Sequence, residues 1–201
     1  MKNNFSKKSK MIIFKETLKR MAEDKSRLLD CYRKENRDPP LFMIFNTSYL
    51  CVFLFRISHY FYLLKRYFLA QTFWFVNLRL TGANIHFGTE IEGGLFLNIP
   101  LGVNLCGRIG RNCTVAGDSA IIKSRSFEDV GAGPGLPVVG DNVFIRSGSI
   151  VHGPVIIGNN SCIGPRCLIE TDLPDNSTVE LTEPIKRIIE NVTADGVDPT
   201  N

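Results

Sequence analysis

The sequence predicts an α+β chain in which an N-terminal helical region is followed by a parallel β-helix of hexapeptide repeats with one extruded loop. Three observations predict this fold class. An aliphatic residue recurs every six positions from Ile85 onward. A strongly apolar segment without that period, residues 41–79, precedes the repeat, and a second aperiodic segment, residues 123–137, interrupts it.

The six-residue period fits neither the 3.6-residue period of a helix nor the 2-residue period of a strand. The aliphatic positions are Ile85, Ile91, Leu97, Val103, Ile109, Val115, Ile121, Val139, Ile145, Val151, Ile157, Ile163 and Ile169. Small or moderate residues stand four positions later, including Thr89, Cys113, Ser119, Ser149, Ser161 and Cys167. Each hexad is expected to supply one short strand and one turn, with the aliphatic side chain pointing inward. Three hexads form a triangular coil of about 18 residues, so the series predicts four to five coils.

The interruption at residues 123–137 reads "KSRSFEDVGAGPGLP" and has no hexad character. Its glycines and Pro134 are typical of a loop that leaves the solenoid. Loops on rigid scaffolds frequently carry binding and catalytic residues, so we expect a functional loop, with a passive insertion as the alternative.

The region before the repeat has two parts. Residues 1–37 are charged and favour a helix, and Pro39-Pro40 is expected to end it. The apolar stretch at 41–55 has 15 residues, fewer than the roughly 20 that a membrane-spanning helix needs. We interpret it as a buried helix, with contact at a membrane surface through 41–79 as the alternative.

These patterns divide the chain into three expected regions. They are a helical region at residues 1–80, a β-helix at 81–181 and a short helix with a disordered tail at 182–201. No secretory signal is expected, because the apolar run from Met11 is too short and Lys15 interrupts it.

Charge is concentrated at the start of the chain. Residues 1–40 hold 12 Lys or Arg against 6 Asp or Glu, whereas the remainder is nearly neutral. Such an arm suits an anionic surface, or it is simply a solvated helix face. The sequence has no aromatic-plus-basic RNA signature, so no nucleic acid partner is expected.

The six cysteines lack the spacing of a metal site. None forms C-x-x-C and no histidine cluster stands near them, so no metal is expected. Several fall on small inward positions of the repeat. This favours reduced, buried thiols and a cytoplasmic protein, with the inner face of the membrane left open.

Several segments resemble serine O-acetyltransferases and the related polysaccharide-biosynthesis acetyltransferases of the hexapeptide-repeat acyltransferase superfamily. The resemblance covers roughly residues 38–180. It rests on six segments: "FRISHYFY" (55–62), "NIHFG" (84–88), "GGLFLNIPLGV" (93–103), the glycine-rich loop at 123–137, "IVHGPVIIGNNSCIGPRCLI" (150–169) and "DLPDNSTV" (172–179).

The resemblance implies a left-handed β-helix, homotrimers or dimers of trimers with active sites between subunits, and acetyl-CoA as co-substrate along the groove. It also implies direct transfer, in which a histidine takes the proton of an acceptor hydroxyl that attacks the thioester. The helical region would then contribute to higher assembly or to membrane contact.

The departures from the family pattern fall on its chemical residues. The family's Asp-His pair aligns with Asn98-Ile99, and the histidine of its loop aligns with Leu136. The Asp before its "IHP" motif is Asn84, and "VELTEPIKRI" (179–188) replaces its exit turn. Isoleucine and leucine cannot accept a proton, so the family's base is missing at both positions.

His152 is the leading candidate for a relocated base. It follows the inward Val151 and is therefore expected to point outward. It lies 54 positions after Asn98, which is three whole coils, so the two are expected to share one face. Asn98 and Asp38 complete the candidate catalytic set. The loop carboxylates Glu128 and Asp129 would need their pKa values raised to act as bases.

The resemblance also locates the candidate cofactor site. The coenzyme arm is expected to pass Gly153, with Gly133, Gly135 and Thr171 as further contacts. The remaining histidines, His59 and His86, are interpreted as structural. The sequence thus predicts an acetyl-CoA-dependent O-acetyltransferase of serine or of a saccharide. The alternative is a catalytically inactive paralogue that serves as a binding or assembly module.

Overall fold

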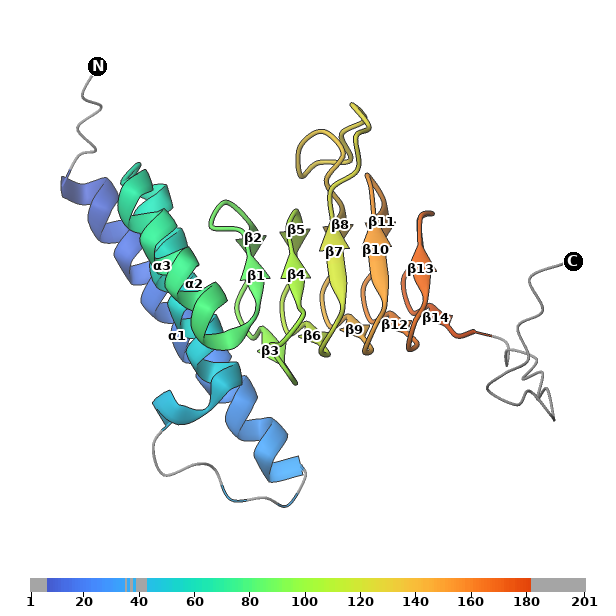
Figure 1. Ribbon diagram of the computed structural model, residues 1–201, viewed down its shortest axis with the longest axis horizontal. Helices are drawn as coiled ribbons and strands as arrows, with labels where there is room; N and C mark the ends of the chain where they lie inside the picture. The colour runs from blue at the N-terminus through green and yellow to red at the C-terminus, as the bar shows by residue number, and fades with distance from the viewer. Residues whose placement is uncertain (1–6, 35, 37, 39–42, 182–201) are drawn as a thin grey trace, which may run out of the picture.

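The computed structural model describes residues 7–34, 36, 38 and 43–181, which form a helical layer followed by a three-sided parallel solenoid (Figure 1). The helices are α1 (Lys7–Lys34), the short 3-10 helix η1 (Met43–Phe45), α2 (Thr47–Leu63) and α3 (Tyr67–Thr81). The expected break at Pro39-Pro40 and the expected helix and tail at 182–201 lie outside the described residues.

The strands form three parallel sheets that run the length of the solenoid. Sheet A contains β1 (Asn84–Ile85), β4 (Asn104–Leu105), β7 (Ala120–Ile122), β10 (Ile150–His152) and β13 (Leu168–Ile169). Sheet B contains β2 (Glu90–Ile91), β5 (Arg108–Ile109), β8 (Val138–Val139) and β11 (Ile156–Ile157). Sheet C contains β3 (Phe96–Leu97), β6 (Thr114–Val115), β9 (Phe144–Ile145), β12 (Cys162–Ile163) and β14 (Thr178–Val179). Strands β1 to β13 visit A, B and C in turn, so one circuit is one coil. After β13 the chain continues sheet B only through an isolated bridge between Ile157 and Leu173, and then enters β14.

The register confirms the hexapeptide coil. Ile91 pairs with Ile109 and Val139 pairs with Ile157, in each case the third aliphatic position further along the series. In the strands up to β13 the second residue points inward and is buried, while the first is more exposed. The serines and threonines predicted to fill the interior donate to backbone carbonyls, as Ser119 does to Arg146 at 2.9 Å. Buried hydroxyls are therefore satisfied, as an apolar interior requires.

One position of the six-residue series is shifted. The strand of sheet A in the second coil has Leu105 as its inward residue, whereas the series predicts Val103. Pro100, Leu101 and Gly102 make the preceding corner longer, and Ile109 then follows Leu105 after a shorter interval. Val103 is buried nonetheless, at the small-residue position before the strand.

Asparagine stabilises the corner between sheets B and C. Asn112, Asn142, Asn160 and Asn176 have φ values of 55°, 57°, 56° and 60°. Asparagine tolerates this left-handed backbone better than most residues. Their side-chain amides bond from coil to coil at 3.4, 3.0 and 3.1 Å. The corner is therefore a hydrogen-bonded ladder that runs parallel to the sheets.

The helical layer covers one end of the solenoid (Figure 1). Helix α2 packs between α1 and α3 and contacts β3, while α3 contacts β1. The buried Arg56 of α2 forms two bonds to the carboxylate of Asp24 of α1, from Nε at 2.8 Å and from Nη2 at 3.0 Å. Arg56 also donates to the carbonyls of Ile91 and Glu92.

Asp24 completes this junction by accepting from two backbone amides of the first coil, Gly94 N–H and Leu95 N–H, both at 2.9 Å. Buried charges are tolerated when they are paired and hydrogen-bonded in this way. The ion pair therefore fixes α1, α2 and the segment that leads into β3 relative to one another. None of the described helices is long and apolar enough to cross a membrane.

Candidate active site

The extruded loop leaves the solenoid between β7 of sheet A and β8 of sheet B, and His152 lies at its base. His152 is the last residue of β10, the neighbour of β7 in sheet A, and it pairs with Ile122. Its side chain points outward and is 37% exposed. The outward orientation expected from the sequence is therefore present in the structure.

A carboxylate orients His152. The Nδ1 atom lies 3.0 Å from Oε1 of Glu170, which follows β13 in the next coil and is 57% exposed. A carboxylate accepts hydrogen bonds, so this contact places the proton of the neutral imidazole on Nδ1 and leaves Nε2 as the acceptor. A histidine held in this tautomer by an acidic partner has the arrangement of a general base.

The neck of the loop borders this histidine. Gly153 N–H donates to Ile122 O and Ser124 N–H donates to Gly135 O, each at 3.0 Å. Gly153 has a φ of 89°, and a Cβ atom there would lie 3.4 Å from the Ser124 side chain. Two of the candidate cofactor residues, Gly153 and Gly135, therefore lie at the neck of the loop, while Thr171 is exposed and directly follows Glu170.

The loop itself is held by internal hydrogen bonds. The carboxylate of Asp129 accepts from Gly131 N–H and Gly133 N–H at 2.8 Å each. These two bonds lower the pKa of Asp129, so this residue is a structural acceptor and not a base. Gly133, another candidate cofactor residue, belongs to this turn.

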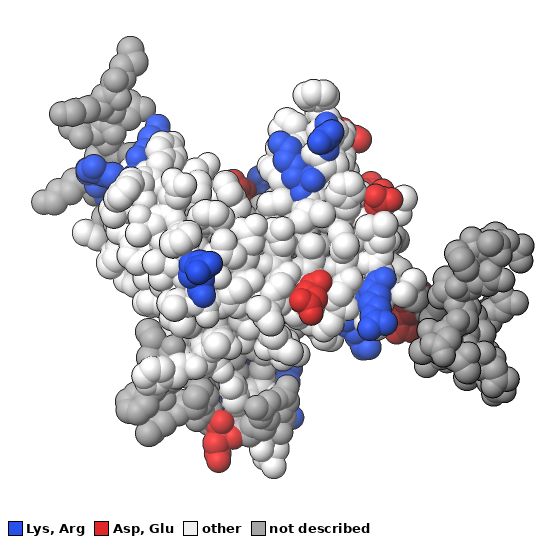
Figure 2. All heavy atoms as spheres, viewed as in Figure 1, with Lys and Arg blue, Asp and Glu red and all other residues white. Residues whose placement is uncertain are grey.

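Exposed side chains give the loop a distinct surface. Phe127 is 94% exposed, and Lys123 and Arg125 are also exposed. The space-filling view shows Lys and Arg side chains at the extruded loop, with Asp and Glu side chains beside them (Figure 2). The exposed Lys123 and Arg125 are the groups of this surface that attract phosphate.

Asn98 lies at a different corner, between β3 of sheet C and β4 of sheet A. Its carbonyl accepts from Ser48 of α2 at 3.3 Å, and its side chain is exposed. It contributes to a small cavity of about 150 Å³ with Tyr32 and Asn46. Asp38 is exposed in the connection between α1 and η1.

The prediction that Asn98 and His152 share one face is wrong. Asn98 follows β3 of sheet C in the first coil, whereas His152 ends β10 of sheet A in the fourth. The loop makes the third coil longer than a regular coil. Paired residues on either side of the loop, Ile121 and Val151, are therefore further apart in sequence than Ile91 and Ile109, which pair across a coil without the loop. Counting 54 positions as three coils therefore assigned Asn98 to the wrong sheet.

The positions that align with the family's histidines are apolar in structure as well as in sequence. Ile99 is 55% exposed and lies against Gly117 of the next coil. Leu136 is half-buried at the neck of the loop. Neither corner offers a titratable group at the expected place.

Glu170 was missed from the sequence, although a signal was available. It stands one uninterrupted coil of the repeat after His152. Outward residues one coil apart are neighbours across a parallel ladder. Searching for acidic residues one coil away from each outward histidine would have found it.

The other two histidines differ in environment from His152. His59 is buried against Phe55, with Nδ1 2.9 Å from Phe87 O, and burial lowers its pKa. His86 accepts from Gly88 N–H through Nδ1 at 3.1 Å, and partial burial lowers its pKa. Both lie in the helical layer or the first coil, away from the loop.

The cysteines carry no disulfide, and the described residues contain no cluster suited to a metal ion. Cys51, Cys113 and Cys167 are buried and the other three are partly buried. Burial raises the pKa of Cys51 and of Cys113 to about 11, so these thiols are unreactive near neutral pH.

Comparison with known proteins agrees with the hexapeptide solenoid. Residues 137–171 match the family model described as "Bacterial transferase hexapeptide (six repeats)". The chain resembles serine acetyltransferases. That of Bacillus subtilis is 32% identical over 126 residues, which are 62% of this chain and 56% of the relative. That of Staphylococcus aureus is 32% identical over 125 residues, 61% of this chain and 57% of the relative.

Solved structures show the same fold. Native serine acetyltransferase 1 of Entamoeba histolytica has a TM-score of 0.70 and 25% identity, and covers 85% of this chain and 66% of its own. Serine acetyltransferase of Neisseria gonorrhoeae in complex with serine has a TM-score of 0.68 and 23% identity, with 85% and 69% covered. The chain spans little more than half of the length of the curated relatives it matches.

Proposed function

We propose that this chain is an acetyl-CoA-dependent O-acetyltransferase of the serine acetyltransferase-like type, acting on a hydroxyl of serine or of a saccharide. The similarity to serine acetyltransferases supports the reaction class. The observation that carries the proposal for this chain is the contact between His152 Nδ1 and Glu170 beside the loop, at 3.0 Å. This contact supplies an oriented base in a chain that has Ile99 and Leu136 at the positions of the family's histidines.

In this mechanism Nε2 of His152 takes the proton of the acceptor hydroxyl while the oxygen attacks the thioester carbon. The attack forms the new C–O bond, and collapse of the tetrahedral intermediate then re-forms the carbonyl and breaks the C–S bond. The imidazolium then returns the proton to the departing thiolate, so the products are an acetyl ester and a free thiol. Glu170 stabilises the imidazolium and holds its orientation.

The neck of the loop fits the co-substrate. Gly133 is only partly buried, so its backbone allows close approach of a slender arm, and the exposed Thr171 supplies a hydroxyl. Gly153 and Gly135 are buried against Ser124 and shape the neck. Lys123 and Arg125 are exposed on the loop and suit the phosphates of acetyl-CoA. No metal takes part in the proposed reaction.

The solenoid is proposed to be a left-handed β-helix, and the chain is proposed to assemble as a homotrimer or a dimer of trimers with active sites between subunits. If the threefold axis runs parallel to the solenoid, rotation preserves the height of each coil. Asn98 of one subunit then remains roughly 10–14 Å from the level of His152 on any subunit, because between two and three strand spacings separate them.

This separation gives Asn98 a role in binding the distal part of an acceptor and not in proton transfer, and we propose Asp38 for the same binding role. An acceptor that touches both levels must be extended. The geometry therefore favours a saccharide over serine within the proposed function.

We place the protein in the cytoplasm, with the apolar region 41–79 either packed between trimers or resting on the inner face of the membrane. Exposed Phe68 and Phe75 of α3 support contact of one of these two kinds.

A specific observation also favours the alternative of a catalytically inactive binding or assembly module. Ile99 presents an exposed aliphatic side chain at the position where the family keeps its base. An apolar corner of this kind suits packing against another chain better than chemistry.

Calorimetry and kinetics distinguish the acetyltransferase from the inactive binding or assembly module. We expect acetyl-CoA to bind and thiol release to depend on an added hydroxyl compound, tested with serine and a saccharide panel. His152→Gln should lower kcat by at least about a hundredfold, the usual scale for a lost general base. His86→Gln is the matched control and should leave kcat unchanged.

Absence of acetyl-CoA binding at millimolar concentration would contradict the enzyme and favour the inactive module. A His152→Gln variant with normal kcat would exclude His152 as the base. Light scattering tests the assembly separately, since a monomer in solution would contradict the trimer.

A further inference from the structure

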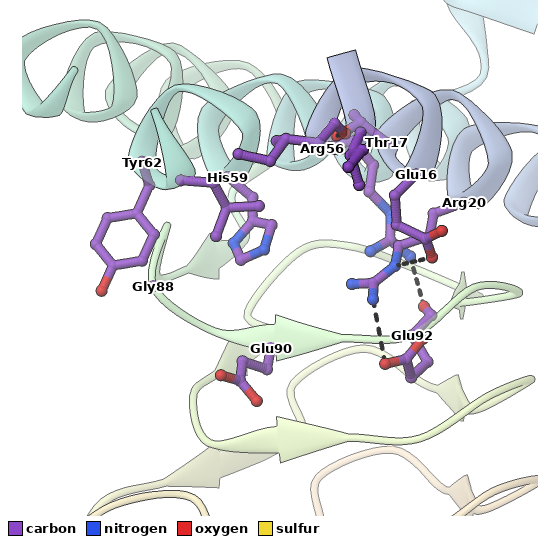
Figure 3. A pocket seen from close by; sticks show the side chains of 12 residues that line it. Glu16, Thr17, Arg20, Arg56, His59, Tyr62, Gly88, Glu90 and Glu92 are labelled. Carbon is purple, nitrogen blue, oxygen red and sulfur yellow. Dashed lines mark hydrogen bonds and ion pairs between the residues drawn. The ribbon is translucent and has the colours of Figure 1, made fainter. Parts of the chain in front are cut away.

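A larger cavity lies at the helix-covered end of the solenoid, between α1, α2 and strand β2 of the first coil (Figure 3). Its volume is about 440 Å³, within the range of small-molecule sites. The proposed transfer site lies in the fourth coil, so this cavity is not part of it.

His59 supplies a buried polar atom to the cavity. The residue is only 7% exposed, and its ring lines the cavity wall. Its Nδ1 lies 2.9 Å from Phe87 O, and because a carbonyl only accepts, Nδ1 carries the proton. Burial lowers the pKa of His59, so the ring is neutral at pH 7.

The Nε2 atom of His59 is consequently an acceptor. Among the described residues no group donates a hydrogen bond to it. Because Nε2 is accessible from the cavity, solvent can donate to it, and an N–H or O–H group of a ligand can replace that solvent. The cavity therefore offers a specific place for an N–H or O–H group.

Carboxylates dominate the rest of the polar lining. Glu16, Glu90 and Glu92 line the cavity. Glu16 and Glu92 turn toward Arg20, whereas Glu90 extends away from the helices toward Arg108 of β5 (Figure 3). Arg20 bonds to both Glu16 and Glu92 at 3.2 Å, which leaves one positive charge for two carboxylates.

The other cations add little to this balance. Arg56 is neutralised by Asp24. Glu90 meets Arg108 at 3.1 Å, but both side chains are at least half exposed, so this pair is weak. The cavity thus combines excess negative charge with hydrogen-bond acceptors.

Aliphatic and aromatic side chains complete the wall. Ile12 and Ile13 of α1 and Leu63 of α2 line it, together with Tyr62. An apolar wall beside a negatively charged, acceptor-rich rim suits a molecule with a cationic head and a short hydrocarbon body. A bare divalent cation fits poorly, because the described residues hold no metal-binding cluster.

We propose that this cavity binds a small alkylammonium ion, whose N–H group donates to His59 Nε2 while Glu90 and Glu92 balance its charge. The hydrocarbon body packs against Ile13 and Leu63. The proposal is independent of acetyl transfer, because it concerns binding at a separate site.

The test uses butylammonium as the probe on the full chain at neutral pH, with long-range proton–nitrogen NMR of the three histidines. We expect a saturable shift of His59 Nε2 at millimolar probe, with His86 and His152 unmoved. Butanol and butyrate, which lack the positive charge, should produce no saturable shift. An unmoved His59, or equal shifts with all three probes, would overturn the proposal.

Two variants locate the site, with the methyl signals of Ile13 and Leu63 as the readout. His59→Asn keeps a donor near the Nδ1 position for Phe87 O but removes the Nε2 acceptor, and should abolish binding. Glu90→Gln should weaken binding by roughly five- to tenfold. Glu180→Gln makes the same change far away and should bind normally.

If His59→Asn does not fold, Glu90→Gln decides alone, since Glu90 is exposed and its loss should not disturb folding. Equal affinities for Glu90→Gln and Glu180→Gln would overturn the proposed charge recognition.

Discussion

The two ends of the solenoid use polar residues in opposite ways. In the first coil, three helices cover the strands, and Asp24, Arg56 and His59 are buried with fixed hydrogen-bond partners. In the fourth coil no helix of the described chain covers the strands, and His152 and Glu170 meet in an exposed pair. The buried polar groups hold helices and strands together through hydrogen bonds, whereas the exposed pair is accessible to a substrate.

The two ends should also differ in what a substitution changes, the free energy of unfolding or the catalytic rate. A buried ion pair whose partner is removed leaves an uncompensated charge, and the cost appears in folding. An exposed pair contributes little to folding, so its loss appears in activity. Changes at the covered end should therefore alter stability, and changes at the open end should alter turnover.

The largest effect is expected from Asp24→Ala at the covered end. It leaves Arg56 buried without its counterion and frees the amides of Gly94 and Leu95. The free energy of unfolding should fall by about 3–5 kcal/mol. Urea denaturation followed by circular dichroism measures it.

Asp30→Ala on the same helix is the matched control, because its exposed pair with Arg33 should contribute less than about 1 kcal/mol. Equal losses for the two variants would mean that burial does not distinguish these ion pairs.

A smaller effect is expected from Glu170→Gln at the open end. An amide cannot stabilise the imidazolium as a carboxylate does, so kcat should fall roughly tenfold. The melting temperature should stay unchanged, because both side chains of the pair are exposed. Steady-state kinetics with the best acceptor, alongside Glu180→Gln, measures the effect, and a normal kcat would remove Glu170 from proton transfer.

The response of stability to pH should also arise mainly from the covered end. Burial lowers the pKa values of His59 and His86 below the ordinary 6.5, so the unfolded chain binds protons first as the pH falls. These two groups should make the free energy of unfolding decrease between about pH 7 and about pH 5. Thermal melts across this range should show a shallower decrease in His59→Asn, and a slope unchanged by that substitution would contradict the assignment.

The smallest effect is expected from Ile99→His. The side chain is more than half exposed, so stability should change by less than about 0.5 kcal/mol. We also expect no gain in acetyl transfer, because Asn98 and Pro100 supply no acidic group to orient the new imidazole. Increased turnover would show that the corner at Asn98 keeps a latent catalytic site.

The interior of the solenoid was predictable because its constraint is local and periodic. An inward aliphatic residue such as Ile109 or Ile157 must recur once per strand, so the period is visible in the sequence. The shift from Val103 to Leu105 was not predictable, because the series counts residues and cannot detect a corner that is longer than the others.

The candidate site was predictable only in part. The outward direction of His152 follows from its place after Val151. Its relation to Asn98 depends on how much the loop lengthens its coil, which the sequence does not state. Buried contacts such as that between Asp24 and Arg56 join segments far apart in the chain. No repeated pattern in the sequence indicates which of these residues meet, so the contacts could not be predicted.

The asparagine ladder at the corner between sheets B and C makes the length of this protein adjustable. Each coil meets its neighbours through the same backbone register and the same amide contacts, so Val139 to Ile156 forms an exchangeable unit. Duplicating or deleting that unit would lengthen or shorten the molecule by one strand spacing. In evolution such a repeat lets a groove be fitted to longer or shorter ligands without redesigning its interior.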